Sequence, residues 1–180
     1  MHHFELSSGI PAPIKDFFLK SATPLSLSDA LKEDRPLVGV NTAFCALTGY
    51  DPDEVLGRNC RFLQPEGPRM EVCDRIRDFF TGSEENSERF AIPNRRKDGT
   101  PFLNILYISK LQKDGETTHY LGSQFDFTRH GKPGIDLYEK ALSKDLRKLN
   151  SLAKEDGYIF LGSIDALASA HALIAQAKFD

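Results

Sequence analysis

The second half of the sequence contains three strand-like runs separated by short polar turns, at residues 87–94, 101–110 and 118–127. The first two runs are joined by RRKDGT, in which the Asp98-Gly99 pair is typical of a β-hairpin turn. The earlier run PLVGVN predicts another strand, and short helices are predicted between it and the three later runs. Strands, short helices and then a three-strand meander indicate an α+β domain with an antiparallel sheet.

The chain divides into three segments. Residues 1–24 contain the amphipathic stretch PIKDFFLKSA, which predicts a helix that caps the core. Residues 25–128 form the core, with short helices predicted at NTAFCALTGY and DPDEVLG and a longer one at MEVCDRIRDFF. Residues 129–180 predict two helices, near 135–153 and near 163–177. The first of these has an apolar stripe made of Ile135, Tyr138, Leu142, Leu146 and Leu149.

Composition excludes several classes of function. A chain of 180 residues with 40% hydrophobic and 27% charged residues is typical of a soluble globular domain with extensions. The net charge of -3 provides no basic surface for nucleic acid, and no apolar run is long enough for a signal segment or a membrane span. We therefore expect a cytoplasmic protein that binds neither nucleic acid nor membrane. Three widely spaced cysteines without a CxxC motif predict reduced thiols and no zinc site.

Three primary amides lie inside the otherwise apolar strands of the meander: Asn94, Asn104 and Gln124. An amide offers both donors and an acceptor, so a set of them can match a heterocycle edge that alternates C=O and N–H groups. Asn94 and Asn104 share a face of the sheet only if the hairpin loop has an odd number of residues. We expect a three-residue loop with Gly99 in the left-handed conformation. The alternative is that each amide only satisfies a nearby loop or backbone group.

The amide face of the meander also carries apolar residues and a glycine. With the expected register, these are Phe102, Leu106, Ile108, Tyr120 and Gly122. They predict an apolar pocket with a polar end, in which Gly122 lets a planar ligand approach the backbone closely. The opposite face is too apolar to be left in water, so we expect the terminal helices to cover it, from the same chain or from a partner subunit.

The stretch GRNCRFLQ places Cys60 between an amide and a guanidinium. Its thiol could be a nucleophile, a metal ligand, a group directed at a bound cofactor, or simply a small buried hydrophobe. Arg61 follows it and Arg77 lies one helix later, and the planar forks of these arginines suit bidentate contact with phosphate. Together with the amides, these residues describe a site for a flat heterocycle with a phosphate tail, which is a flavin nucleotide.

The same stretch resembles the signature of light-oxygen-voltage (LOV) domains, the flavin-binding branch of the PAS fold. The resemblance covers about residues 25–128, and NTAFCALTGYDPDEVLG, DRIRD, NRRKDGTPFLN and GSQFD also look like the family. It implies a five-stranded antiparallel sheet with short helices, flanked here by N- and C-terminal helices. Two departures are visible at Asn94: Arg95 stands where the family often has an aromatic residue, and Pro93 suggests a sheet edge or a bulge.

The resemblance implies a photochemical role for the site. Blue light would make the flavin electrophilic at C4a, and Cys60 would form a bond there that breaks again in the dark. By matching position, Asn59, Gln64, Asn94 and Asn104 are the expected polar flavin contacts, with Leu106 and Gly122 in the same pocket. Arg61 and Arg77 would hold the phosphate, and Gln124 would sense protonation at N5. The stretch between Gln64 and Arg77 is short, which favours FMN over the alternatives FAD and riboflavin.

Three functions remain for testing. The first is a blue-light photoreceptor that signals through its terminal helices or a homodimer to an unknown downstream partner, as in short bacterial LOV proteins with no fused effector. No enzymatic segment follows the core, so we do not expect an enzyme. The second is a flavin redox module in which Cys60 serves thiol chemistry in the dark, and the third is a PAS interaction module without a chromophore.

Overall fold

A computed structural model describes residues 2–5, 8–67, 70–82 and 84–161 of the chain. Its centre is an antiparallel sheet of six strands in the order β2-β1-β5-β4-β3, with β6 paired to β4 beside β3. The strands are β1 (Leu25–Asp29), β2 (Leu37–Val40), β3 (Ser87–Arg95), β4 (Pro101–Lys113), β5 (Glu116–Asp126) and β6 (Tyr158–Leu161). The predicted α+β fold with an antiparallel sheet is confirmed, and the predicted edge position of Pro93 is confirmed because β3 ends the strand order.

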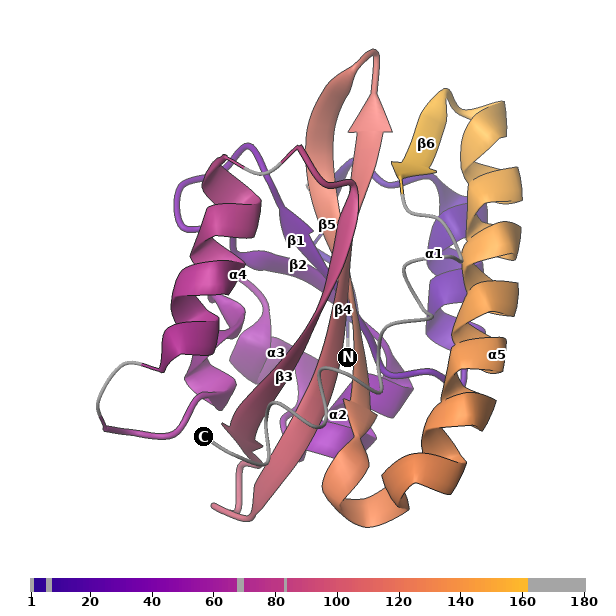
Figure 1. The fold of residues 1–180 in the computed structure, drawn as a ribbon. Helices are drawn as coiled ribbons and strands as arrows, with labels where there is room; N and C mark the ends of the chain where they lie inside the picture. The colour runs from indigo at the N-terminus through magenta and orange to yellow at the C-terminus, as the bar shows by residue number, and fades with distance from the viewer. Residues whose placement is uncertain (1, 6–7, 68–69, 83, 162–180) are drawn as a thin grey trace.

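Helices cover both faces of the sheet (Figure 1). One face carries α2 (Thr42–Thr48), α3 (Pro52–Val55), the 3-10 helix η2 (Cys60–Leu63) and α4 (Glu71–Thr81). The opposite face carries α1 (Ala12–Lys20) and the long helix α5 (Phe127–Glu155). None of the described helices combines the length and the apolar character needed to cross a membrane.

The short helices begin and end where the sequence predicts. Asn41 caps α2 by accepting a hydrogen bond from the Phe44 backbone N–H at 2.9 Å, and Gly49 ends it in the left-handed conformation with φ 79°. Asp51 and Glu54 form a capping box at the start of α3. These caps fix the path of the chain toward Gly57, whose φ of 80° turns it into the GRNCRFLQ stretch.

The loop of the β3–β4 hairpin has an odd number of residues, as predicted for Asn94 and Asn104 to lie on one face of the sheet. The Arg96 backbone N–H donates to the Thr100 carbonyl at 3.0 Å, which leaves residues 97–99 as a three-residue loop. Gly99 has φ 88°, in the left-handed region that glycine adopts readily. Asn94 therefore pairs with Phe102 and Asn104 pairs with Ile92, so the two amides lie on one face, as predicted.

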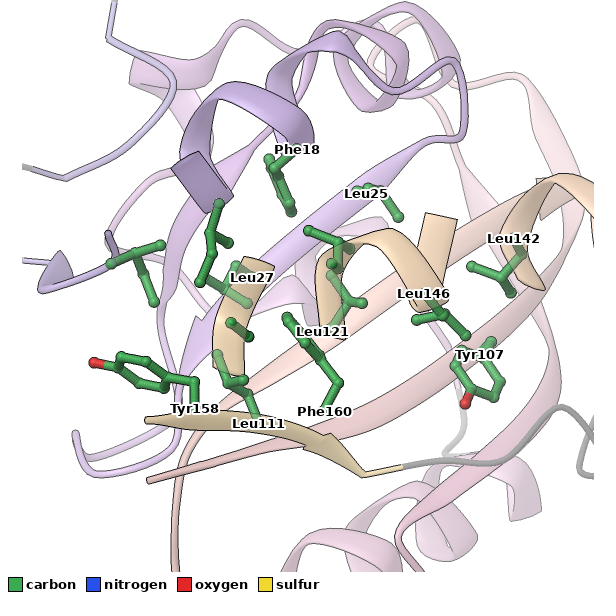
Figure 2. Packing of buried hydrophobic residues seen from close by; sticks show 14 of the residues in the cluster. Phe18, Leu25, Leu27, Tyr107, Leu111, Leu121, Leu142, Leu146, Tyr158 and Phe160 are labelled. Atoms are coloured by element: carbon green, nitrogen blue, oxygen red, sulfur yellow. The ribbon is translucent and has the colours of Figure 1, made fainter. Parts of the chain in front are cut away.

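The apolar face of the sheet is covered by the chain's own terminal helices. Ile14 and Phe18 of α1 are buried against it, and the predicted stripe of α5 is buried along its whole length. Figure 2 shows Leu142 and Leu146 of α5 directed toward Tyr107 and Leu121 of the sheet. The sequence allowed cover by helices of the same chain or of a partner subunit. In the described residues, helices of the same chain cover this face.

The C-terminal segment differs from the prediction in two ways. Its helix begins at Phe127 rather than near residue 135, and it passes through a kink at Gly131, where φ is 59°, next to Pro133. The chain then forms β6, which pairs with β4 and was not predicted, because a four-residue strand after a helix has no clear periodic signal. The second helix predicted near 163–177 lies outside the described residues.

Candidate functional site

A pocket lies between the amide face of the sheet and the layer formed by η2 and α4. Its lining includes all of the predicted site residues except Arg77: Asn59, Cys60, Arg61, Gln64, Asn94, Asn104, Leu106, Gly122 and Gln124. The predicted face residues Ile108 and Tyr120 also line the pocket, whereas Phe102, predicted with them, is not part of the lining. Further lining comes from residues that the sequence did not single out: Ser26, Ser28, Arg35, Leu37, Leu63, Ile76, Phe80 and Ile92.

Cys60 is the first residue of η2 and lies at the pocket wall. Asn59 caps this helix, because its side-chain oxygen accepts from the Arg61 backbone N–H at 3.0 Å. The Asn59 amide N–H₂ donates to the Asp34 carbonyl at 2.6 Å, which ties η2 to the turn before β2. Burial raises the pKa of the Cys60 thiol to about 12, since the apolar surroundings disfavour a thiolate. Cys60 therefore presents a protonated thiol at neutral pH.

The three amides form the polar end of the pocket, and all are buried. Asn104 Nδ2 donates to Asn94 Oδ1 at 2.9 Å, so the two predicted contacts meet directly. Each also satisfies a backbone group: Asn94 Nδ2 donates to the Pro93 carbonyl at 3.0 Å, and Asn104 Oδ1 accepts from the Phe125 N–H at 3.2 Å. Asn94 and Asn104 thus share a face of the sheet, as predicted. They also satisfy nearby backbone groups, which was the alternative interpretation of these amides.

Gln124 has one side of its amide engaged and one side open. Its Nε2 donates to Ser26 Oγ at 3.2 Å, while its buried Oε1 has no hydrogen-bond partner among the described residues. An unsatisfied buried oxygen is costly, so this atom is available to a ligand or to a rotation of the amide.

Gly122 lies opposite Ser26 on the neighbouring strand, and its space is limited by that residue. A Cβ at Gly122 would lie 2.6 Å from Ser26 Oγ and 3.1 Å from Gln124 Nε2. A side chain at this position would displace the Ser26 hydroxyl that accepts from the Gln124 amide, and it would also hinder the close approach of a ligand predicted from the sequence. Ser26 and Ser28 could have been found from the alternation in LSLSD, which places both serines on one strand face.

The arginines are arranged differently from the prediction. Arg61 lines the pocket, and its fork makes a two-bond ion pair with Asp34, at 2.7 Å from Nη1 and 2.5 Å from Nη2. This contact lowers the pKa of the exposed Asp34 carboxyl. Arg77 is outside the pocket lining, and its half-exposed side chain pairs with Asp74 at 3.1 Å. Arg35 is the second arginine of the lining, and no sequence motif indicates it.

Cys73 and Gln64 lie at the edge of the site, and Cys45 lies away from it. Cys73 Sγ donates to Gln64 Oε1 at 3.4 Å, so it contacts the pocket only through Gln64. Burial, with a smaller effect of Asp51, raises the pKa of Cys45 to about 11. All three cysteines are unpaired in the structure, and the described residues contain no cluster of His, Cys, Asp or Glu that could hold a metal ion.

The pocket as a whole fits a flat heterocycle. Leu37, Leu63, Ile76, Ile92 and Leu106 supply apolar walls, and the amides supply hydrogen-bonding groups at one end. The open Oε1 of Gln124 provides a buried polar atom that such a ligand could satisfy. These features match the requirements of a flavin ring.

Comparisons with known proteins indicate which family the chain resembles. A family model described as a PAS domain matches residues 28–129. The chain is 35% identical over 176 residues to a blue-light-activated histidine kinase of Rhizobium johnstonii, which covers 88% of this chain and 50% of the relative. The chain spans half or less of the length of the first curated relatives it matches.

Solved structures of similar length match nearly the whole chain. The structure of the RsLOV d2 variant is 30% identical, with a TM-score of 0.74 over 93% of this chain and 95% of that one. The crystal structure of the Rhodobacter sphaeroides LOV protein is 27% identical, with a TM-score of 0.75 over 92% of this chain and 95% of that one.

Proposed function

Because the chain belongs to the LOV family of PAS domains, we propose that it is a blue-light photoreceptor that binds a flavin nucleotide and forms a reversible bond between Cys60 and flavin C4a. The observation that carries this proposal is the position of a protonated Cys60 thiol in the wall of a pocket that buried amides also line.

The bound flavin supplies the light absorption and, when excited, a basic N5 and an electrophilic C4a. Cys60 would supply both parts of the addition, its proton to N5 and its sulfur to C4a. In the dark, loss of the S–C bond would return the proton from N5 to the Cys60 thiol. Because the thiol carries its own proton at neutral pH, the step needs no neighbouring base.

The amides orient the ring. Asn94, Asn104 and Gln64 are the groups that would bond its polar edge, and Gln124 would contact N5. The local bonds of Asn94 and Asn104 hold their side chains in place, so little ordering remains to be done when a ligand binds.

FMN is the proposed flavin, with FAD and riboflavin as the alternatives. The segment between Gln64 and Arg77 is short, which leaves little chain to accommodate an adenine dinucleotide. Arg61 lies at the pocket and is the proposed phosphate contact. The role of Arg77 remains a prediction, and it would require the side chain to leave Asp74.

The proposed output passes from Gln124 to helix α5. Ser123, next to Gln124 on β5, points to the opposite face and shares a 2.6 Å hydrogen bond with Tyr138 of α5. Two residues beyond Gln124, Asp126 caps α5 by accepting from the Arg129 N–H at 3.0 Å. Rotation of the Gln124 amide after N5 gains a proton would alter the bonding of this strand and shift the docking of α5.

We propose a sensory role in the cytoplasm rather than an enzymatic one, with a homodimer formed through the terminal helices. The outer sheet face is already covered by α1 and α5, so a partner would meet the outer surface of these helices, where Leu137 is 71% exposed. The downstream protein that receives the signal would contact the same surface.

The properties of Cys60 argue against the alternative function, a flavin redox module in which this thiol reacts in the dark. A nucleophilic cysteine needs a thiolate, and burial holds the pKa of Cys60 far above neutral. This favours a group that reacts only when light makes its partner electrophilic.

An absorption spectrum of the purified protein, before and after blue light, tests the proposal. We expect a yellow protein whose blue absorption band bleaches under illumination and recovers in the dark. A colourless protein that takes up no added flavin would indicate an interaction module, and a yellow protein that does not bleach would indicate a flavin module without the photoreaction.

A further inference from the structure

The turn before β2 forms a charged rim at one end of the pocket. Asp34 and Arg35 both have left-handed backbone conformations, with φ 63° and 47°, and the Arg35 N–H donates to the Lys32 carbonyl at 3.2 Å. Two consecutive residues with side chains rarely adopt this conformation, so the surrounding contacts must hold the turn in place. Asp34 is held by Asn59 and Arg61, which directly flank Cys60.

This turn directs the Arg35 side chain into the pocket lining. The guanidinium lies over the Phe80 ring, 4.6 Å from its centroid, so α4 positions it from the other side. Arg35 Nε is buried and has no hydrogen-bond partner among the described residues. The fork of Arg61, in contrast, is engaged by Asp34.

Arg35 lies at the end of the pocket away from the amides. Phe80, beneath its guanidinium, contacts Tyr120, with ring centroids 4.6 Å apart. Tyr120 precedes Gln124 by four residues on β5, which corresponds to about 13 Å along an extended strand. A ring held by the amides would therefore direct its substituents toward the end where Arg35 and Arg61 lie.

We propose that Arg35 is a phosphate-binding residue that makes this pocket select a phosphorylated flavin over riboflavin. Its unsatisfied Nε and its place beside Arg61 give the rim two guanidinium groups, and planar forks are well matched to phosphate oxygens. This inference rests on the proposed flavin function and assigns to Arg35 a contact that the sequence assigned to Arg77.

The test compares FMN and riboflavin on the same apoprotein, by quenching of flavin fluorescence. In Arg35→Gln we expect the dissociation constant for FMN to rise about tenfold or more, the effect of one lost charge-assisted bond, while that for riboflavin changes less than about twofold. Arg58→Gln is the matched control, because Arg58 stacks on Phe62 and donates to the Glu54 carbonyl outside the pocket lining. It should leave both constants unchanged.

A second variant separates charge from backbone geometry. Arg35→Asn places a residue that tolerates the left-handed conformation at this position, and it should show the same loss of selectivity if the guanidinium is responsible. If both variants bind both flavins and the ratio of the two dissociation constants is unchanged, the proposed role of Arg35 is wrong. The proposed flavin-binding function would not be affected by that result. A parent protein that binds neither flavin would reject the proposed function from which the inference starts.

Discussion

The cysteines of this chain differ in their position relative to the pocket, whose lining contains Cys60 but neither Cys45 nor Cys73. Cys45 packs beside the apolar cluster of α2 and α3, and Cys73 donates to Gln64 from α4. Residue type alone does not distinguish these thiols. Their positions around one cavity do, and they lead to separate expectations.

Replacing Cys60 with alanine should leave flavin binding in place and abolish the reversible bleach, because other residues build the pocket while the bond requires sulfur. Cys45→Ala and Cys73→Ala are the controls and should bleach and recover. The measurement is the absorption spectrum after a blue-light pulse. Reversible bleaching in Cys60→Ala like that of the parent would assign the bond to another cysteine.

The raised pKa of Cys60 also predicts a pH dependence of stability. Burial moves the pKa of this thiol from 9.0 to about 12 in the folded state, so folding favours the protonated form. The resulting stabilisation is complete below pH 9 and is lost as the pH rises toward 12. Urea unfolding should show that the free energy of unfolding falls more steeply above pH 9 in the parent than in Cys60→Ala. Parallel curves for the two proteins would contradict this.

At the scale of elements, α5 is joined to the sheet by polar contacts as well as by its apolar stripe. Arg89 of β3, with a side chain only 2% exposed, pairs with Glu139 at 2.5 Å, and Tyr138 bonds Ser123. Buried polar contacts of this kind are direction-dependent, so they favour one docked position of the helix. The strand that carries Gln124 is therefore coupled to one arrangement of α5.

Gln124→Leu should still form the Cys60 bond but largely lose the light-dependent change in helix docking or oligomeric state. Leucine has no amide to rotate when N5 gains a proton, whereas the thiol chemistry is unaffected. Light and dark size-exclusion and scattering profiles provide the measurement. If these profiles differ in Gln124→Leu as much as in the parent, the relay through this amide is wrong.

Because only one side of α5 is buried, we expect the effect of a leucine-to-alanine change on stability to depend on which side of the helix the leucine occupies. Leu142 is fully buried against the sheet, and Leu142→Ala should lower the free energy of unfolding by about 2–5 kcal/mol. Leu137 on the same helix is 71% exposed, and Leu137→Ala should change the free energy of unfolding by no more than about 0.5 kcal/mol. Chemical denaturation of both variants checks the pair, and similar losses would contradict the docking of α5 described here.

At the scale of the whole molecule, the terminal segments complete a core that residues 25–128 leave open. The apolar cluster on the sheet face that the terminal helices cover joins Phe18 of α1, near the start of the chain, to Leu121 of β5, Leu142 of α5 and Phe160 of β6 (Figure 2). The pocket on the other face needs none of these residues for its lining. The pocket and the terminal helices thus lie on opposite faces of one sheet.

A fragment of residues 25–128 should therefore associate or lose stability, because it exposes side chains whose burial contributes roughly 1.5–3 kcal/mol each. Light scattering and urea unfolding of the fragment and the full chain give the comparison. A fragment that is soluble, monomeric and as stable as the full chain would show that the terminal helices are not needed to cover the sheet.

The sequence by itself determined the features that depend on local chemistry. The odd hairpin loop follows from a glycine suited to positive φ, the caps of α2 and α3 follow from Asn41 and Asp51, and the stripe of α5 follows from helical spacing. The shared face of Asn94 and Asn104 then follows from the alternation of side chains along strands. These properties are set by neighbours in the chain, so the pattern of residues carries them.

Only the tertiary structure decided which side chains meet across the pocket. Arg35 enters the lining because a strained turn rests on Asn59 and Arg61, about 25 residues away, whereas Arg77 pairs with Asp74 outside the lining. The pairing of β6 with β4 and the choice of an intramolecular cover for the sheet also join distant segments. Such contacts depend on long-range geometry and on competition between partners for the same charge or surface, for which a single sequence has no local signal.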